Sequence, residues 1–152
     1  MSKSIVVYFS AEAGRTRSIA EALSRKTGSV LFEIIPDPPY TPADLRYTNP
    51  LARCNREKIG KKEVPVRGKI EDWESFDTVL LGFPIWYYGA PNVVSTFCKG
   101  YDWSGKRVYI FATSGGSGIG KTKEKLEPYM KGAEVLDAKR VDSVGELAEW
   151  SL

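Results

Sequence analysis

One apolar run constrains the fold more than any other part of this sequence. Residues 78–83, Thr-Val-Leu-Leu-Gly-Phe, have the length of a β-strand and are almost continuously apolar, and Pro84 ends the run. A strand of this composition is buried on both faces, which is typical of a central strand in a parallel sheet. The run therefore predicts a sheet that is covered on both sides.

The rest of the chain alternates between strand-like and helix-like segments. In the segment 16–27, Ile19, Ala20 and Leu23 have helical spacing, and Gly28 stands where a C-terminal cap belongs. The expected strands are 5–9, 29–35, 78–83, 107–112 and 134–138, and the expected helices are 16–27, 91–97, 123–130 and 144–150, with a short helical segment near 70–76 and an irregular helix near 52–59. Five strands separated by helices predict a doubly wound α/β sandwich.

The composition favours one globular domain over residues 1–152. The chain has 42% hydrophobic residues, no histidine and two cysteines, Cys54 and Cys98, which form no C-x-x-C pair. Neither a metal site nor a disulfide framework is indicated, and a reducing cytoplasm fits best. No apolar run approaches the about 18 residues that a membrane span needs. We expect a cytoplasmic protein without a membrane partner.

A basic stretch follows the second predicted strand. It contains Arg53, Arg56, Lys58, Lys61, Lys62, Arg67 and Lys69, against only Glu57 and Glu63, and the whole chain carries a formal charge of +3. Nucleic-acid binding would need stacking aromatics within this stretch, and none stands between Tyr47 and Trp73. A solvated surface is the better interpretation, and no nucleic-acid partner is expected.

The loop after the first predicted strand has the character of an anion site. Residues 10–16, Ser-Ala-Glu-Ala-Gly-Arg-Thr, join a strand to a helix, whose first N–H groups have no partner within the helix. Gly14 permits a tight turn, and Arg15 adds a guanidinium group that suits a phosphate. The hydroxyls of Ser10 and Thr16 could donate to phosphate oxygens or cap the helix. An ordinary N-cap on a strand-to-helix turn is the simpler alternative.

The loop after the third predicted strand is aromatic. It reads Pro84, Ile85, Trp86, Tyr87, Tyr88, Gly89. Three adjacent aromatic side chains of one short loop cannot all point into the core, so at least one should offer its face to a flat ligand or to a partner. The alternative is that the rings form a local cluster.

The loop after the fourth predicted strand is rich in glycine. Residues 115–122 match the phosphate-loop pattern G-x-x-x-x-G-K-[ST] of nucleotide triphosphatases. Only about thirty residues and one more strand follow, Asp137 is a weak candidate for a metal-holding carboxylate, and the next helix begins with a charged, solvated turn. We therefore interpret the glycines as backbone that closely approaches a ligand, with the triphosphatase as a remote alternative.

Together, the three loops suit a ligand with a flat heteroaromatic ring and one phosphate group. The sequence also resembles the flavodoxin-like FMN proteins, as a short-chain member, over nearly its whole length. The stretches that carry the resemblance are 5–10 with Gly14 and Thr16, 39–40, 81–87 with Pro91 and Phe97, and 111–118. The resemblance implies a five-stranded parallel sheet in the order 2-1-3-4-5 and FMN as the cofactor.

The resemblance also implies three groups of cofactor-binding residues. Ser10, Glu12, Ala13, Gly14, Arg15 and Thr16 would hold the phosphate; Pro84, Ile85, Trp86, Tyr87, Tyr88 and Gly89 would cover the isoalloxazine ring; and Thr113, Ser114, Gly115, Gly116, Ser117 and Gly118 would line its other edge. Two features depart from the family. The first loop has seven residues instead of six, with Ala13 in place of a hydroxyl, and the chain is basic where flavodoxin carriers are acidic.

The resulting hypothesis is an FMN-binding redox protein that transfers electrons through its flavin. No catalytic acid–base residue and no metal site is evident, and the partners would be redox proteins or a small-molecule electron acceptor. An NAD(P)H-dependent FMN or quinone reductase is the alternative within redox chemistry. Two other families with this architecture do not fit. Pro84 stands where a response regulator needs its phosphoacceptor aspartate, and the first loop lacks the cysteine of a small tyrosine phosphatase.

Overall fold

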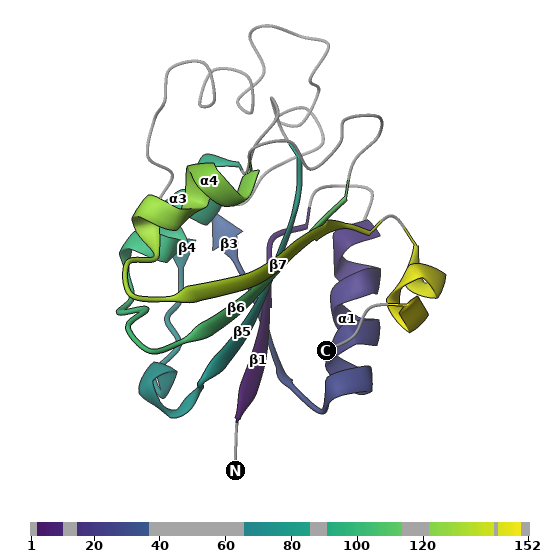
Figure 1. The fold of residues 1–152 in the computed structure, drawn as a ribbon, viewed down its shortest axis with the longest axis horizontal. Coiled ribbons are helices and arrows are strands. Elements are labelled where there is room, and N and C mark those ends of the chain that lie inside the picture. The colour runs from purple at the N-terminus through teal and green to yellow at the C-terminus, as the bar shows by residue number, and fades with distance from the viewer. Residues whose placement is uncertain are drawn as a thin grey trace, which may run out of the picture.

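The computed structural model describes residues 3–10, 15–36, 66–85, 91–113, 122–141 and 143–149. Strands and helices alternate along this part of the chain (Figure 1). The elements are β1 (Ser4–Tyr8), α1 (Arg15–Thr27), β2 (Val30–Glu33), β3 (Ile35–Pro36), β4 (Val66–Arg67), η2 (Trp73–Ser75), β5 (Thr78–Pro84), α3 (Asn92–Lys99), β6 (Arg107–Thr113), α4 (Thr122–Leu126), η3 (Glu127–Tyr129), β7 (Glu134–Arg140) and η4 (Val144–Glu149).

The main sheet has the strand order β2-β1-β5-β6-β7, and all neighbouring strands in it are parallel. Counted along the chain, its five strands follow the order 2-1-3-4-5, so the predicted fold class and topology are confirmed. The apolar run 78–83 forms β5, which lies in the middle of the sheet with Val79 to Phe83 buried. Its burial follows from its position, because helices cover both of its faces.

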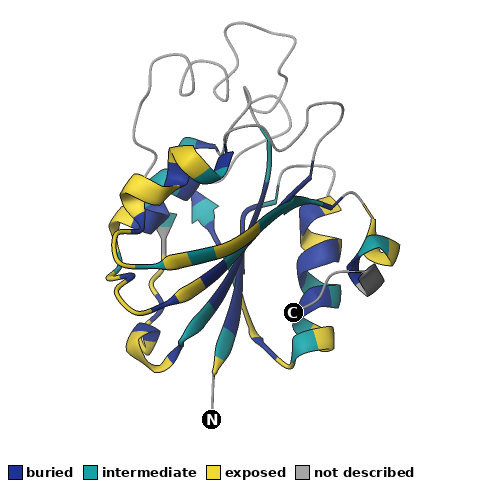
Figure 2. Ribbon diagram, in the orientation of Figure 1, coloured by how far each residue is buried: buried dark blue, intermediate teal, exposed yellow. Residues whose placement is uncertain are grey.

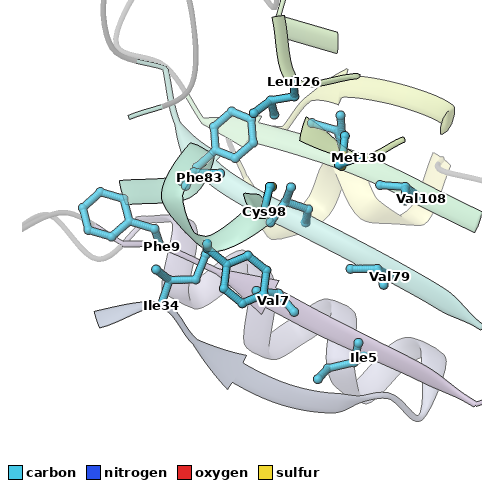
Figure 3. Packing of buried hydrophobic residues seen from close by; sticks show 14 of the residues in the cluster. Ile5, Val7, Phe9, Ile34, Val79, Phe83, Cys98, Val108, Leu126 and Met130 are labelled. Atoms are coloured by element: carbon cyan, nitrogen blue, oxygen red, sulfur yellow. The ribbon is translucent and has the colours of Figure 1, made fainter. Parts of the chain in front are cut away.

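Two apolar clusters lie on the two faces of the sheet. In Figure 1, α3 and α4 lie on one face and α1 and η4 on the other. Alternate residues of each strand point to opposite faces, so Val7 and Val79 join the α3 side while Val6 and Leu80 join the α1 side. Figure 3 shows the α3 cluster, and Figure 2 shows that the helices expose their outer residues and bury their inner ones.

The strand predicted at 29–35 is divided in two. The N–H group of Ile34 still donates to the carbonyl of Tyr8 at 2.6 Å, which continues the bonding beside β1. The chain then leaves the main sheet, and Ile35 and Pro36 of β3 pair antiparallel with Arg67 and Val66 of β4. Proline has no N–H group to donate to a ladder, so Pro36 cannot extend an inner parallel pairing.

The helices of the structure differ from the predicted ones mainly at their ends. Gly28 has a φ of +68°, as a C-terminal cap requires, and α1 ends just before it. The helix predicted at 123–130 is α4 followed by the 3₁₀-helix η3, since Pro128 cannot donate to an α-helical bond. The segments at 70–76 and 144–150 are also 3₁₀-helices, η2 and η4. The helix expected near 52–59 lies outside the described residues.

A buried lysine joins η2 to the start of β6. Lys106 is only 6% exposed, and its Nζ donates to the carbonyl of Trp73 at 3.0 Å and to the carbonyl of Phe76. The same Nζ lies 4.8 Å from the centre of the Trp73 ring. Burial lowers the pKa of the Lys106 ammonium group because it disfavours the charged form. Lys106 is therefore an internal donor for two carbonyl groups.

Candidate functional site

The candidate site lies where β1, β5 and β6 end. These strands are neighbours and run parallel, so their carboxyl ends meet at one edge of the sheet (Figure 1). The three predicted ligand loops follow these three strands, and α1 begins at the same edge. In doubly wound sheets, ligands bind beyond this edge, at the point where the strand order reverses. Here that point lies between β1 and β5.

The described part of the chain includes six of the predicted cofactor-binding residues. These are Ser10, Arg15, Thr16, Pro84, Ile85 and Thr113. The other predicted residues lie outside it: Glu12, Ala13, Gly14, Trp86, Tyr87, Tyr88, Gly89, Ser114, Gly115, Gly116, Ser117 and Gly118. The described residues are the points at which each loop leaves the sheet or enters α1, so they define how the loops are anchored.

The first loop begins at Ser10, and the side chain of this residue caps α1. Its Oγ accepts the N–H group of Arg17, at 3.3 Å. Arg17 is the third residue of α1, and this N–H group has no partner within the helix. Of the two predicted roles for the Ser10 hydroxyl, the structure therefore shows the capping role. Such a bond also holds the beginning of the loop beside the first turn of α1.

Thr16 and Thr113 connect the first loop to the third. Their Oγ1 atoms lie 2.8 Å apart, within hydrogen-bond distance, and either hydroxyl could be the donor. The two residues are only 2% and 4% exposed. Thr16 lies in the first turn of α1, and Thr113 is the last residue of β6. Both residues belong to the predicted site, but their contact could not be predicted from the sequence, because nothing local links residues that are 97 positions apart.

The backbone of Thr113 holds the second loop as well. Its carbonyl accepts the N–H group of Ile85 at 2.8 Å, directly after β5 ends at Pro84. Next to this contact, the N–H group of Phe9 donates to the carbonyl of Gly82 at 2.9 Å, just beyond the end of β1. Thr113 therefore contacts the anchor of each of the other two loops and is itself the anchor of the third.

The charges near the start of α1 favour an anion. Arg15 and Arg17 are exposed in the first turn, and this turn contains no acidic residue. A helix start carries partial positive charge from its backbone dipoles, which ordinarily attracts acidic side chains. Two arginines at this position add to that positive charge. The donor set of backbone N–H groups, hydroxyls and a guanidinium group fits a phosphate.

Tyr8 also lies at this edge, although it is not among the predicted site residues. Burial raises the pKa of the Tyr8 phenol, and the nearby Glu33 raises it further, while Arg17 acts in the opposite direction. Tyr8 ends β1 and pairs with Glu33 of β2 in the register of the sheet. The signal in the sequence that could have identified Tyr8 is its position near the carboxyl end of a predicted strand.

The described residues contain no candidate metal cluster, and residues 115–121 of the triphosphate-loop pattern lie outside them. Within them, no group of three or more His, Cys, Asp or Glu side chains could hold a metal ion, and no helix is long and apolar enough to span a membrane. Helix α4, which follows the glycine-rich loop, has only five residues, and Thr122 at its start is completely buried. Asp137 is exposed, and its Oδ1 accepts the N–H group of Ala138.

Comparison with protein families and solved structures gives one consistent result. The family model described as flavodoxin matches residues 3–151. No curated protein matches the chain. A candidate flavoprotein from Bacteroides eggerthii DSM 20697 is 35% identical, with a TM-score of 0.87, and the match covers 99% of this chain and 96% of that one.

Two further structures are similar over almost their full length. A candidate flavoprotein from Bacteroides uniformis ATCC 8492 is 31% identical with a TM-score of 0.89, covering 98% of this chain and 97% of the other. A flavoprotein from Lactobacillus acidophilus NCFM, solved in complex with FMN, is 21% identical with a TM-score of 0.70 and full coverage of both chains. At that identity, the last match shows the fold alone.

Proposed function

Because this chain belongs to the flavodoxin family, we propose that it binds FMN at the carboxyl edge of the sheet and transfers electrons through the bound flavin. The observation that carries the proposal is the contact of Thr113 with the anchors of both other loops, Thr16 and Ile85. This arrangement joins the start of α1 to the points at which the other two loops leave the sheet. The FMN complex of the Lactobacillus acidophilus protein, which has the same fold, supports this choice of cofactor.

Each end of FMN has candidate residues in this chain. The phosphate would be held by the backbone N–H groups at the start of α1, by the Thr16 hydroxyl and by Arg15. Pro84, Ile85 and the aromatic residues after them would cover the isoalloxazine ring, and the glycine-rich loop after Thr113 would line its other edge. The flavin itself accepts and donates the electrons, while the protein binds it, orients it and excludes water.

The proposal also includes a partner that exchanges electrons with the protein. A redox protein or a small-molecule electron acceptor would exchange electrons with the flavin. The formal charge of +3 on the chain favours an anionic partner over the basic reductases that suit acidic carriers. This observation also supports the second candidate, an NAD(P)H-dependent FMN or quinone reductase, because reduced nicotinamide dinucleotides are anionic.

The visible spectrum of the purified protein, with and without reduced nicotinamide, tests both candidates. We expect a yellow protein that releases FMN and no FAD on denaturation, since the first loop provides one anion site and no second dinucleotide fingerprint follows. Anaerobic bleaching by NADH or NADPH would identify a reductase, and a spectrum that changes only with a chemical reductant would identify a carrier. A colourless protein that cannot be reconstituted with FMN would contradict the proposal, and binding of ATP with Mg²⁺ would favour the triphosphatase.

A further inference from the structure

We propose that Thr113 is a positioning residue for the FMN phosphate: its hydroxyl donates to Thr16, and this leaves the Thr16 proton to be donated to the phosphate. Thr113 would thus increase the preference for FMN over riboflavin without touching the phosphate itself. This inference rests on the proposed function and assigns a role to a bond that the structure shows directly, the 2.8 Å contact between the two Oγ1 atoms.

The direction of the bond follows from the hydrogen-bonding capacity of a hydroxyl. Each threonine hydroxyl has one proton to donate and two lone pairs that accept. If Thr16 donated to Thr113, it would present only lone pairs to a phosphate at the start of α1, and these would repel the anion. If Thr113 donates to Thr16, the Thr16 proton remains for a phosphate oxygen. A bound phosphate therefore selects the second arrangement.

Because both threonines are buried, the direction of the hydrogen bond between them is important. Thr16 and Thr113 are 2% and 4% exposed, so bulk water has little access to replace either partner. A buried hydroxyl without a partner is unfavourable, and hydrogen bonds that follow one another in a chain strengthen each other. Thr113, Thr16 and the phosphate would form such a chain. Loss of the first donor would weaken the bond that Thr16 makes to the anion.

The two contacts of Thr113 can be separated by mutation. Its carbonyl holds the N–H group of Ile85 at the beginning of the aromatic loop, and its side chain holds Thr16. Thr113→Val removes the hydroxyl but keeps the backbone bond and the β-branched shape that suits a strand. The effect of this variant should therefore appear at the phosphate end of FMN. It should be small at the ring, which riboflavin shares with FMN.

The experiment is a titration of FMN and riboflavin into the apoprotein of the wild type and of Thr113→Val, Thr113→Ser, Thr16→Val and the Thr16→Val/Thr113→Val double variant. Thr113→Val should lower the FMN-over-riboflavin affinity ratio by less than the about tenfold expected for loss of a complete net hydrogen bond, because Thr16 keeps its own bond to the phosphate and loses only the donor that strengthens and orients it. Thr113→Ser should keep the ratio. Thr16→Val should lose at least as much as Thr113→Val, and the double variant should lose no more than Thr16→Val, because both changes act through one bond.

A second hydroxyl pair provides a matched control. Ser4 and Ser29 join their Oγ atoms at 2.6 Å at the opposite edge of the sheet, where β1 begins. The Ser29 Oγ also lies 2.5 Å from the Oγ1 of Thr27, so Ser29→Ala removes hydroxyl contacts of the same kind far from the proposed phosphate, and the affinity ratio should not change. Thermal unfolding of each variant confirms that it is folded. If Thr113→Val does not fold, Thr113→Cys, which replaces the hydroxyl by a weak donor, should show the same loss.

Two results would overturn the inference while leaving the proposed function intact. In the first, Thr113→Val binds FMN and riboflavin with the wild-type ratio. In the second, it weakens both flavins equally, which would assign Thr113 a purely structural role. If the folded wild type binds neither flavin, the proposed function fails and the inference fails with it.

Discussion

The ring of Phe111 occupies the space where a side chain on Gly82 would lie. A Cβ atom built on Gly82 would be 2.0 Å from Cζ of Phe111. The two residues are register partners on β5 and β6, and the ring of Phe111 packs in the cluster on the α1 side of the sheet. Any larger residue at position 82 would have to displace a completely buried aromatic ring. The absence of a side chain at this position is therefore a packing requirement of the sheet face that carries α1.

The first prediction concerns this contact. Gly82→Ala should lower the free energy of unfolding by about 1–3 kcal/mol, because an overpacked core forces side chains or backbone to move. Urea unfolding measures the change. Gly145→Ala is the control, since a Cβ there has its nearest neighbour at 4.0 Å and the residue is exposed. Adding Phe111→Leu to Gly82→Ala should recover part of the loss, and strict additivity of the two changes would contradict the explanation.

The second prediction concerns the anion site. If Arg15 binds the phosphate, Arg15→Ala should weaken FMN binding by about 1–3 kcal/mol, as expected for loss of a hydrogen bond to a charged group, and hardly affect riboflavin. The effect should diminish with salt, because exposed charges are screened over about 10 Å at 0.1 M ionic strength. Titration of both flavins at two salt concentrations measures it. Arg17→Ala is the charge-matched control. An equal loss of FMN affinity in Arg17→Ala would show that the effect is general electrostatics and not a bond from Arg15 to the phosphate.

The third prediction concerns the aromatic loop, residues 86–88, which lies outside the described part of the chain. If one of Trp86, Tyr87 and Tyr88 stacks on the flavin, its replacement by alanine should weaken FMN and riboflavin equally, by about 1–3 kcal/mol, by analogy with base–aromatic stacking. Fluorescence titration of the three variants would identify the residue. Wild-type affinity in all three would exclude stacking. Gly89→Ala should shift the flavin potential more than the affinity, because glycine permits a backbone change beside the ring.

The fourth prediction concerns the buried lysine. Lys106→Met should destabilise the protein by about 1–3 kcal/mol, since it removes the donor to the carbonyls of Trp73 and Phe76. Burial lowers the pKa of Lys106 in the folded protein, so the unfolded chain binds more protons at alkaline pH below the ordinary lysine pKa of about 10.4. The contribution of Lys106 to stability should therefore rise with pH in this range.

Comparison of the wild type with Lys106→Met isolates the titration of Lys106. The difference in free energy of unfolding between the wild type and Lys106→Met should increase as the pH rises towards the ordinary lysine pKa of about 10.4, while the contributions of other titrating groups cancel. Chemical denaturation at several pH values measures the difference. A difference that decreases over this range would mean that the carbonyl groups stabilise the charged ammonium more than burial penalises it.

The fifth prediction concerns Cys98. Its side chain is completely buried between the sheet and α3, as Figure 3 shows, and burial raises the pKa of its thiol far above the usual range. A thiol without thiolate character or access is inert. In a Cys54→Ser variant, a thiol reagent should therefore label the native protein only as fast as it unfolds. Labelling that increases with reagent concentration and is unaffected by stabilising conditions would contradict this.

Local patterns explain why the topology could be predicted. The nearly continuous apolar run at 78–83 predicted a strand buried on both faces, and the spacing of Ile19, Ala20 and Leu23 predicted a helix beside the sheet. Gly28 marked the end of that helix. Such patterns arise because a strand and a helix repeat their buried positions with different periods, so that neighbours in sequence are sufficient to identify the element. The resemblance to flavodoxins then implied the order of the strands.

The contacts that join these elements were decided by the tertiary structure alone. Thr16 and Thr113 are 97 positions apart, and only the meeting of α1 with the end of β6 places their hydroxyls within 2.8 Å. In the same way, no pattern in the sequence marks Gly82 as a packing position, and only the register of β5 against β6 places the ring of Phe111 where a side chain on Gly82 would lie. Hydrogen bonds and packing between distant residues depend on register and on distance in space, and no periodicity of a single segment carries that information.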